Sequence, residues 1–218
     1  MIDTILYGDC RETLKNLTNL SVQTCVTSPP YYGLRDYGGE EKQLGQENSP
    51  KEYIDNLVNV FRIIKDKLSD DGTLWVNLGD SYYNYRPGKG QSYPKQSVSK
   101  TKQDLPDKCN KRGNKLDGLK EKDLIGIPWM FAFAMRDDGW YLRQDIIWHK
   151  PNPMPESVKD RCTKSHEHIF LFSKNKKYYY DNEAIKEDAK DWGTRDRSKG
   201  KYHNAGTGLS PHSGLEKS

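Results

Sequence analysis

Three observations predict an α/β protein in which helices flank a mostly parallel sheet. Apolar residues recur at helical spacing over residues 52–68, a pattern typical of an amphipathic helix. An apolar run at 73–78 follows this helix, and another lies earlier, at 22–26; both are typical of buried strands. A strand, a helix and a second strand in this order form a βαβ unit, whose two strands are parallel.

The remaining segments continue this alternation. The long helix should begin at Ser49-Pro50 and end near Asp71-Gly72, and Pro128 suits the first turn of a second helix. The other expected elements are a short helix at 11–17, the second helix at 124–138, two strands at 140–148 and 169–173 that pair with each other, and a closing helix at 181–190.

Composition separates a folded region, residues 1–83 and 123–190, from two polar segments. Residues 84–122 hold eleven Lys and Arg against four Asp and Glu, which predicts a basic flexible insertion. This insertion is either a solvated loop or a segment that binds DNA phosphates. Residues 191–218 form a polar, glycine-rich tail.

The bulk properties limit the classes of protein to consider. The net charge is +4 and the mean hydropathy −0.99, which permits nucleic-acid binding without requiring it. Four cysteines, at 10, 25, 109 and 162, lack the spacing of a zinc site. With no secretory leader and no long apolar run, we expect a cytoplasmic protein with reduced thiols and no membrane contact.

The segment Thr27-Ser28-Pro29-Pro30-Tyr31-Tyr32 directly follows the first buried strand. Because prolines cannot donate to a β-ladder, the strand must end there, and Ser28 is held extended by the proline that follows it. The result is a rigid strand tip rich in carbonyl and hydroxyl oxygens, with an aromatic ring beside it. Such a tip can bind a planar base with an exocyclic amine, since the oxygens accept from the amine and the ring stacks on the base.

This segment resembles motif IV of the DNA amino-methyltransferases, which methylate N4 of cytosine or N6 of adenine with S-adenosylmethionine. Further segments are similar to the β-type members, in which the catalytic half precedes the cofactor-binding half: a short strand at 5–7 with Gly8-Asp9-Cys10, and the runs 71–80, 145–153 and 166–174. The resemblance implies a Rossmann-like S-adenosylmethionine-dependent methyltransferase fold, a bacterial or phage enzyme, and double-stranded DNA as its partner.

The resemblance also implies roles for single residues. Methyl transfer is a direct displacement by the base nitrogen, so the catalytic residues are those that hold the amine and the flipped-out base: Ser28, Pro29, Pro30 and Tyr31. The residues implied near the cofactor are Asp9, Cys10, Thr27 and Ser28. Asp9 is equally suited to cap the helix at 11–17, and we interpret Cys10 and Cys25 as core thiols rather than nucleophiles.

Several cationic residues flank prolines and turns near the same motifs. The residues expected to contact nucleic acid are Tyr32, Arg35, Lys150, Arg161 and Lys164. Tyr32 could equally pack beneath the loop, and for Trp148 we favour packing in the core over a place along the path of the base. His166 and His168 share one face of a strand while Glu167 points away, so we expect no metal site.

The sequence departs from the family at one place. No Phe-x-Gly-x-Gly segment, which approaches the cofactor's methionine end, follows residue 185, and Ala205 to Gly208 lack a preceding strand. We therefore expect a fold truncated before the glycine-rich motif, and a missing C-terminal half or second chain that carries it.

Serine before the prolines favours N4-cytosine over N6-adenine. Two alternatives remain open at this point: an inactive or split fragment that only binds DNA, and a methyltransferase for RNA or protein amines.

Overall fold

The computed structural model describes residues 3–35, 43–83 and 118–187. The chain divides into two units, Met1–Tyr180 and Asp181–Ser218, and the first contains every helix and strand of the described residues. Residues 181–187 are not helical, so the helix predicted at 181–190 is absent from its described part. Most of the basic insertion, residues 84–117, and the tail at 191–218 lie outside the described residues.

Four strands form one sheet in the order β1-β2-β4-β3. The prediction of a mostly parallel sheet is wrong in detail: β1 and β2 are parallel, but β4 runs antiparallel to both β2 and β3. The reason is that β3 and β4 form an antiparallel pair inserted beside β2, without a helical crossover between them. The strand bounds are Val22–Thr27 for β1, Leu68–Leu78 for β2, Tyr141–His149 for β3 and His166–Ser173 for β4.

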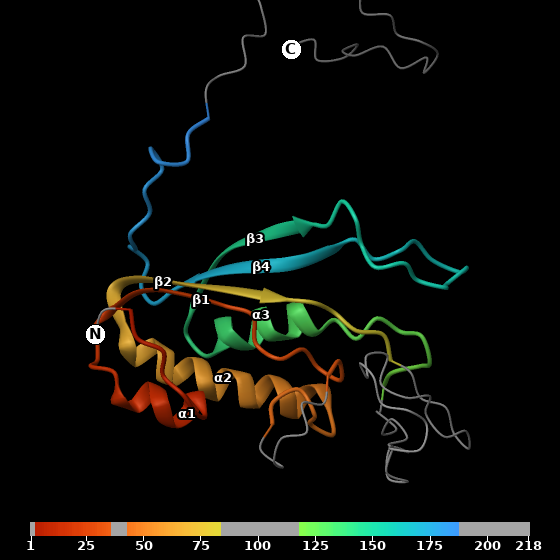
Figure 1. Cartoon of the computed structure of the whole chain (residues 1–218), viewed down its shortest axis with the longest axis horizontal. Helices are drawn as coiled ribbons and strands as arrows, with labels where there is room; N and C mark the ends of the chain where they lie inside the picture. Colours follow the sequence, from red (N-terminus) through yellow and green to blue (C-terminus); the bar gives the residue numbers. More distant parts are fainter. Residues whose placement is uncertain (1–2, 36–42, 84–117, 188–218) are drawn as a thin grey trace, which may run out of the picture. The chain divides into compact units, whose positions relative to one another are not determined.

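Two long helices cover one face of the sheet, as Figure 1 shows. Helix α2 (Pro50–Lys67) and helix α3 (Ile127–Asp137) confirm the two long helices predicted from the sequence. The side chain of Ser49 accepts a hydrogen bond from the Glu52 amide over 3.2 Å, which is the expected N-cap of α2. A short helix α1 (Cys10–Thr13) and a 3-10 turn (Leu14–Asn16) precede β1.

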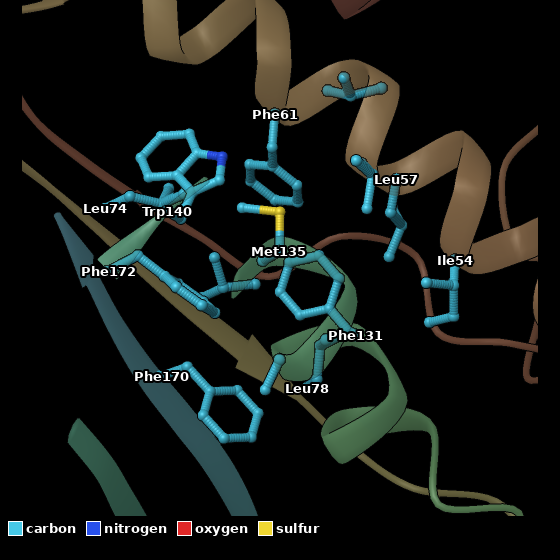
Figure 2. Close-up of a cluster of buried hydrophobic side chains, with 14 of the residues drawn as sticks. Ile54, Leu57, Phe61, Leu74, Leu78, Phe131, Met135, Trp140, Phe170 and Phe172 are labelled. Atoms are coloured by element: carbon cyan, nitrogen blue, oxygen red, sulfur yellow. The ribbon is translucent and has the colours of Figure 1, made fainter. Parts of the chain in front are cut away.

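The core lies between these two helices and the sheet (Figure 2). Phe131 of α3 packs its ring against Phe61 of α2, with ring centroids 5.3 Å apart, and against Phe172 of β4, at 5.8 Å. Leu74 and Leu78 of β2 are fully buried beneath them. Alternate residues of the central strands therefore fix which face of the sheet meets the helices.

The opposite face of the sheet carries polar residues near the ends of the strands. Leu78 pairs with His168, which stacks on Phe170 of the core, so these residues mark the helix-covered face. Since side chains alternate along a strand, Asn77 of β2 and Glu167 of β4 point to the other face. Trp148 pairs with Glu167 and shares this face.

Three local expectations are wrong. Residues 5–7 are not a strand, because they pair with no strand of the described residues, and Tyr7 is 86% exposed. Trp148 is 55% exposed rather than packed in the core, because β3 is an edge strand of the sheet. Cys10 is exposed at the start of α1, whereas Cys25 is partly buried against the core.

The point where the basic insertion leaves the fold is closed by backbone hydrogen bonds. The amide of Tyr83 donates to Asp123 over 2.8 Å, and the amide of Lys122 donates back to Tyr83 over 2.9 Å. The amide of Ile125 donates to Ser81 over 2.9 Å. Residues 81–83 and 122–125 therefore form an antiparallel neck on which the insertion is mounted.

Candidate active site

The strand tip predicted from the sequence lies at the end of β1, beside the end of its parallel neighbour β2. The fully buried Tyr53 of α2 donates its hydroxyl hydrogen to the carbonyl of Pro30 over 2.7 Å, which ties the tip to the core. Ser28 is exposed at the tip. Among the described residues, no hydrogen bond occupies the carbonyl of Pro29. The hydroxyl oxygen of the exposed Ser28 and the carbonyl of the half-buried Pro29 are thus available as acceptors.

The side chain of Tyr31 is held at its hydroxyl by residues from two other strands. Its O–H group lies 2.9 Å from both Asn77 Oδ1 and Glu167 Oε2, and it receives a longer hydrogen bond of 3.4 Å from the Ser28 hydroxyl. Burial, together with the nearby Glu167 carboxylate, raises the pKa of Tyr31 to about 12. The phenol is therefore neutral at physiological pH and donates its proton to an acceptor.

The ring of Tyr31 lies directly against the backbone of Gly79. A Cβ atom at position 79 would lie 2.7 Å from Tyr31 Cε2 and 3.1 Å from its Cδ2, closer than carbon atoms normally approach. Gly79 is buried at the end of β2. The absence of a side chain at this position is therefore what lets the ring lie there.

Glu167 is an ionised carboxylate in a mostly buried position. Its side chain is 16% exposed, and its Oε1 forms a short ion pair with Lys150 Nζ. Burial alone would raise the pKa of Glu167, but hydrogen bonds from Lys150 and Tyr31 outweigh it and lower the pKa below its usual value. Lys150, expected from the sequence to contact nucleic acid, is thus bound to a carboxylate of the protein.

Asp80, just beyond β2, joins the strand tip region to helix α3. Its Oδ1 accepts from the amides of Gly126 and Ile127 over 3.0 and 2.9 Å, so the carboxylate caps the first turn of α3. Gly126 has a φ of +84°, a backbone conformation that favours glycine. Lys164 Nζ donates to the Asp80 carbonyl over 2.7 Å, and burial lowers the pKa of this lysine.

The other residues predicted to bind nucleic acid have mixed surroundings. The Arg161 guanidinium lies 3.9 Å from the centre of the Tyr82 ring and pairs with Glu156 over 2.6 Å. Arg35 is exposed, whereas Tyr32 packs its ring on Tyr53 with centroids 5.5 Å apart. Their contacts with DNA stay predictions, and Tyr32 has the packing role that was its alternative.

The residues implied near the cofactor lie in two places. Asp9 accepts from the amide and the guanidinium of Arg11, both at 2.9 Å, and so caps α1 as its alternative interpretation predicted. Cys10 follows it at the surface, while Thr27 is half-buried at the end of β1, beside Ser28. Contact of these residues with a cofactor stays a prediction.

His168 and His166 lie on the helix-covered face, with ring centroids 5.4 Å apart, and His168 Nδ1 lies 3.0 Å from the Asp145 carboxylate. No group of three metal-binding side chains occurs in the described part of the chain.

Comparison with known proteins identifies the family. The profile for N6/N4 methyltransferases, described as DNA methylase, matches residues 22–212. The chain belongs to the DNA methylase family. It is 49% identical over 194 residues to the type II methyltransferase M.Cfr9I of Citrobacter freundii, and 51% identical over 192 residues to M.SmaI of Serratia marcescens. These matches cover 89% and 86% of this chain but only 62% and 61% of the relatives' own lengths.

Solved structures show that this chain has the α/β fold of methyltransferases. The cytosine-N4-specific PvuII DNA methyltransferase superposes with a TM-score of 0.53 at 20% identity, over 80% of this chain and 50% of that chain. A proposed DNA modification methylase of Thermus thermophilus, solved with S-adenosyl-L-methionine, gives a TM-score of 0.50 at 21% identity, over 81% of this chain and 55% of that one.

The sequence alone does not reveal three residues of the candidate site: Asn77, Gly79 and Glu167. Asn77 is a polar residue between two fully buried apolar ones, and such a residue in a strand signals a specific partner. For Glu167, the sequence shows only that its side chain points to the face of the strand opposite the two histidines. Its partner Tyr31 lies 136 residues earlier, and only the register of β2 and β4 brings them together.

Proposed function

We propose that this chain is the catalytic part of a DNA methyltransferase that transfers a methyl group from S-adenosylmethionine to an exocyclic amine of a base. The observation that carries the proposal is the strand tip, where the exposed Ser28 and the half-buried Pro29 lie beside a fixed aromatic ring. Membership of the DNA methylase family and the type II methyltransferase names of the relatives support it.

The tip acts on the amine of a base that has left the duplex stack. Ser28 donates its own hydrogen to Tyr31, so its lone pairs face the substrate and accept from one N–H of the base. The Pro29 carbonyl accepts from the other. Both bonds draw the nitrogen lone pair out of conjugation with the ring, which makes the nitrogen more nucleophilic.

S-adenosylmethionine supplies the methyl group on a sulfonium, whose sulfur takes the electron pair of the breaking S–CH3 bond. The nitrogen forms the new N–CH3 bond and then loses one proton to solvent. Serine at position 28, rather than aspartate, favours N4-cytosine over N6-adenine as the target. Tyr31 is the aromatic ring on which the base stacks, an interaction worth about 1–3 kcal/mol per base.

The cofactor site requires more than these residues. Thr27 and Ser28 supply polar groups at the strand tip, and Asp9 is an exposed carboxylate, but the sequence lacks the Phe-x-Gly-x-Gly turn. We infer that a segment carrying this turn, in a longer chain or a second one, pairs with β1. Among the described residues, β1 pairs only with β2, and its Val26 is 74% exposed. An open strand edge with exposed apolar residues favours the addition of a strand.

The test is methyl transfer from labelled S-adenosylmethionine to mixed-sequence duplex DNA, with nucleoside analysis of the product. The chain is assayed alone and with the C-terminal part of a relative such as M.SmaI added in trans. We expect N4-methylcytosine only when the second segment is present. Micromolar cofactor binding by this chain alone, measured by calorimetry, would contradict the need for that segment.

Matched variants test the strand tip. Ser28→Ala should reduce methyl transfer with little change in DNA binding, and Tyr31→Ala should weaken binding of the flipped base. Ser21→Ala, at the other end of β1, and Tyr141→Ala, an exposed tyrosine at the far end of β3, are the controls. Unchanged turnover in both tip variants would remove the strand tip as the active site. Binding of duplex DNA without any transfer would favour a non-catalytic module.

A further inference from the structure

We propose that Glu167 is a positioning residue that locks the Tyr31 ring against Gly79, so that the ring is preset to receive the flipped-out base. The inference rests on the proposed function for the role of the base, but the lock itself is a property of this chain. It assigns a function in the site to a carboxylate of β4 that does not belong to the Ser-Pro-Pro-Tyr motif.

The first argument is geometric. A tyrosine in a loop after a strand has two free torsions, yet Tyr31 is held at both ends of its side chain. Its hydroxyl is bound by Glu167 and Asn77, each at 2.9 Å, and its Cε2 edge lies against the buried backbone of Gly79. Moving the ring away from Gly79 would therefore break the hydrogen bonds at its hydroxyl.

The second argument is electrostatic. Lys150 keeps Glu167 ionised, and a charged acceptor forms a stronger hydrogen bond than a neutral one. Asn77 is the second acceptor for the same proton, but it is a neutral amide. The bond from Tyr31 to Glu167 therefore fixes the ring more strongly than the bond to Asn77 does.

The third argument concerns the cost of binding. Stacking of a base on a mobile ring must first immobilise that ring, which weakens binding by roughly 2- to 10-fold for each side chain that is ordered. A ring fixed before DNA arrives avoids this loss. The lock therefore acts on the capture of the base and hence on KM for DNA, whereas kcat should change little.

The fixed ring can be observed without any methyl transfer. In this chain with 13C-labelled tyrosine, slow rotation of the Tyr31 ring gives separate NMR signals for its two ε positions, assigned by their loss in Tyr31→Phe. We expect two ε signals in the unaltered chain, one averaged signal in Glu167→Ala, and slow rotation retained in Glu167→Gln, which keeps a neutral acceptor. Glu183→Gln, which alters another glutamate paired with a lysine, is the control and should change nothing.

Methyl-transfer kinetics, measured with the C-terminal part of a relative added in trans, then test the expected effect on KM for DNA. Glu167→Ala should raise KM for DNA about 2- to 10-fold with kcat nearly unchanged, and Glu167→Gln should recover most of that loss. In a Tyr31→Phe background, which lacks the hydroxyl, Glu167→Ala should have no further effect on KM. Dispersed amide NMR spectra identify folded variants, and if Glu167→Ala does not fold, Glu167→Gln carries the comparison with a smaller expected loss.

The outcomes separate the two proposals. A single averaged ε signal in the unaltered chain, or slow ring rotation unchanged in folded Glu167→Ala, would overturn the lock whatever the kinetics show. An equal loss in KM with and without the Tyr31 hydroxyl would also overturn it, because Glu167 would then act elsewhere. If no form of the chain transfers a methyl group, the proposed function fails, and the NMR result alone decides the lock.

Discussion

Gly79→Ala is expected to destabilise the protein only because of the ring beside it. The added Cβ would lie 2.7 Å from Tyr31 Cε2, roughly 1 Å inside the normal separation of two carbon atoms. The backbone at Gly79 is not in the left-handed region, so alanine meets no conformational strain there. Overpacking of this kind costs about 1–3 kcal/mol, which lowers the melting temperature of a chain of this size by roughly 2–12 °C.

The sign of the effect should reverse when the ring is removed. In a Tyr31→Ala background the Cβ added at position 79 meets no ring, and a Gly→Ala change at a compatible position stabilises by about 0.4–1 kcal/mol through the unfolded state. In a Tyr31→Phe background, which keeps the ring, Gly79→Ala should still destabilise. Urea unfolding of the five variants with the unaltered chain measures these differences. Equal destabilisation in the Tyr31→Ala background would refute the contact as the cause.

Three further predictions concern the supports of the site. Tyr53→Phe removes the hydrogen bond to the Pro30 carbonyl and should lower the free energy of unfolding, measured in urea, by about 0.5–1.5 kcal/mol and slow methyl transfer. If neither the free energy of unfolding nor the rate of methyl transfer changes, the bond does not support the strand tip. Asp80→Ala removes the cap of α3 and should cost about 1–2 kcal/mol, while Asp80→Asn should cost less; the same loss in both would point to charge rather than capping. The pKa of Glu167 is lower in the folded than in the unfolded chain, so its contribution to stability is present above the unfolded pKa, near 4.5, and disappears as the pH falls through the folded pKa. Glu167→Gln should therefore flatten the fall in unfolding free energy below about pH 4.5, and an unchanged acid limb would contradict the lowered pKa.

The sequence predicts the parts of the fold whose causes are local. Ser49, Pro50 and the apolar spacing after them fix the start and the buried face of α2, and Pro128 marks the first turn of α3. The direction of β4 relative to β2 has no such local cause, and this is why the sheet is mixed rather than mostly parallel. The expectation that Trp148 packs in the core is wrong for a related reason, because the amino-acid sequence does not show that β3 is an edge strand.

The candidate site divides in the same way. The strand tip at Ser28 to Tyr31 is visible in the sequence because prolines constrain the backbone next to them. Gly79 and Glu167 are not visible, because each matters only through a partner brought near by strand register. The contact of Lys150 with nucleic acid stays a prediction, and its carboxylate partner could not be derived from spacing alone.

The closed neck of the insertion has a consequence for how this protein could change. Residues 81–83 and 122–125 hold the two ends of the insertion together, and the Asp80 carboxylate secures the start of α3 beside them. A segment whose ends are already joined changes the free energy of folding only slowly with its length. Residues 84–117 could thus be exchanged or shortened between related proteins as a cassette, leaving the strand tip and its supports unaltered. A change in this segment and the conservation of the strand tip could then evolve separately within one chain.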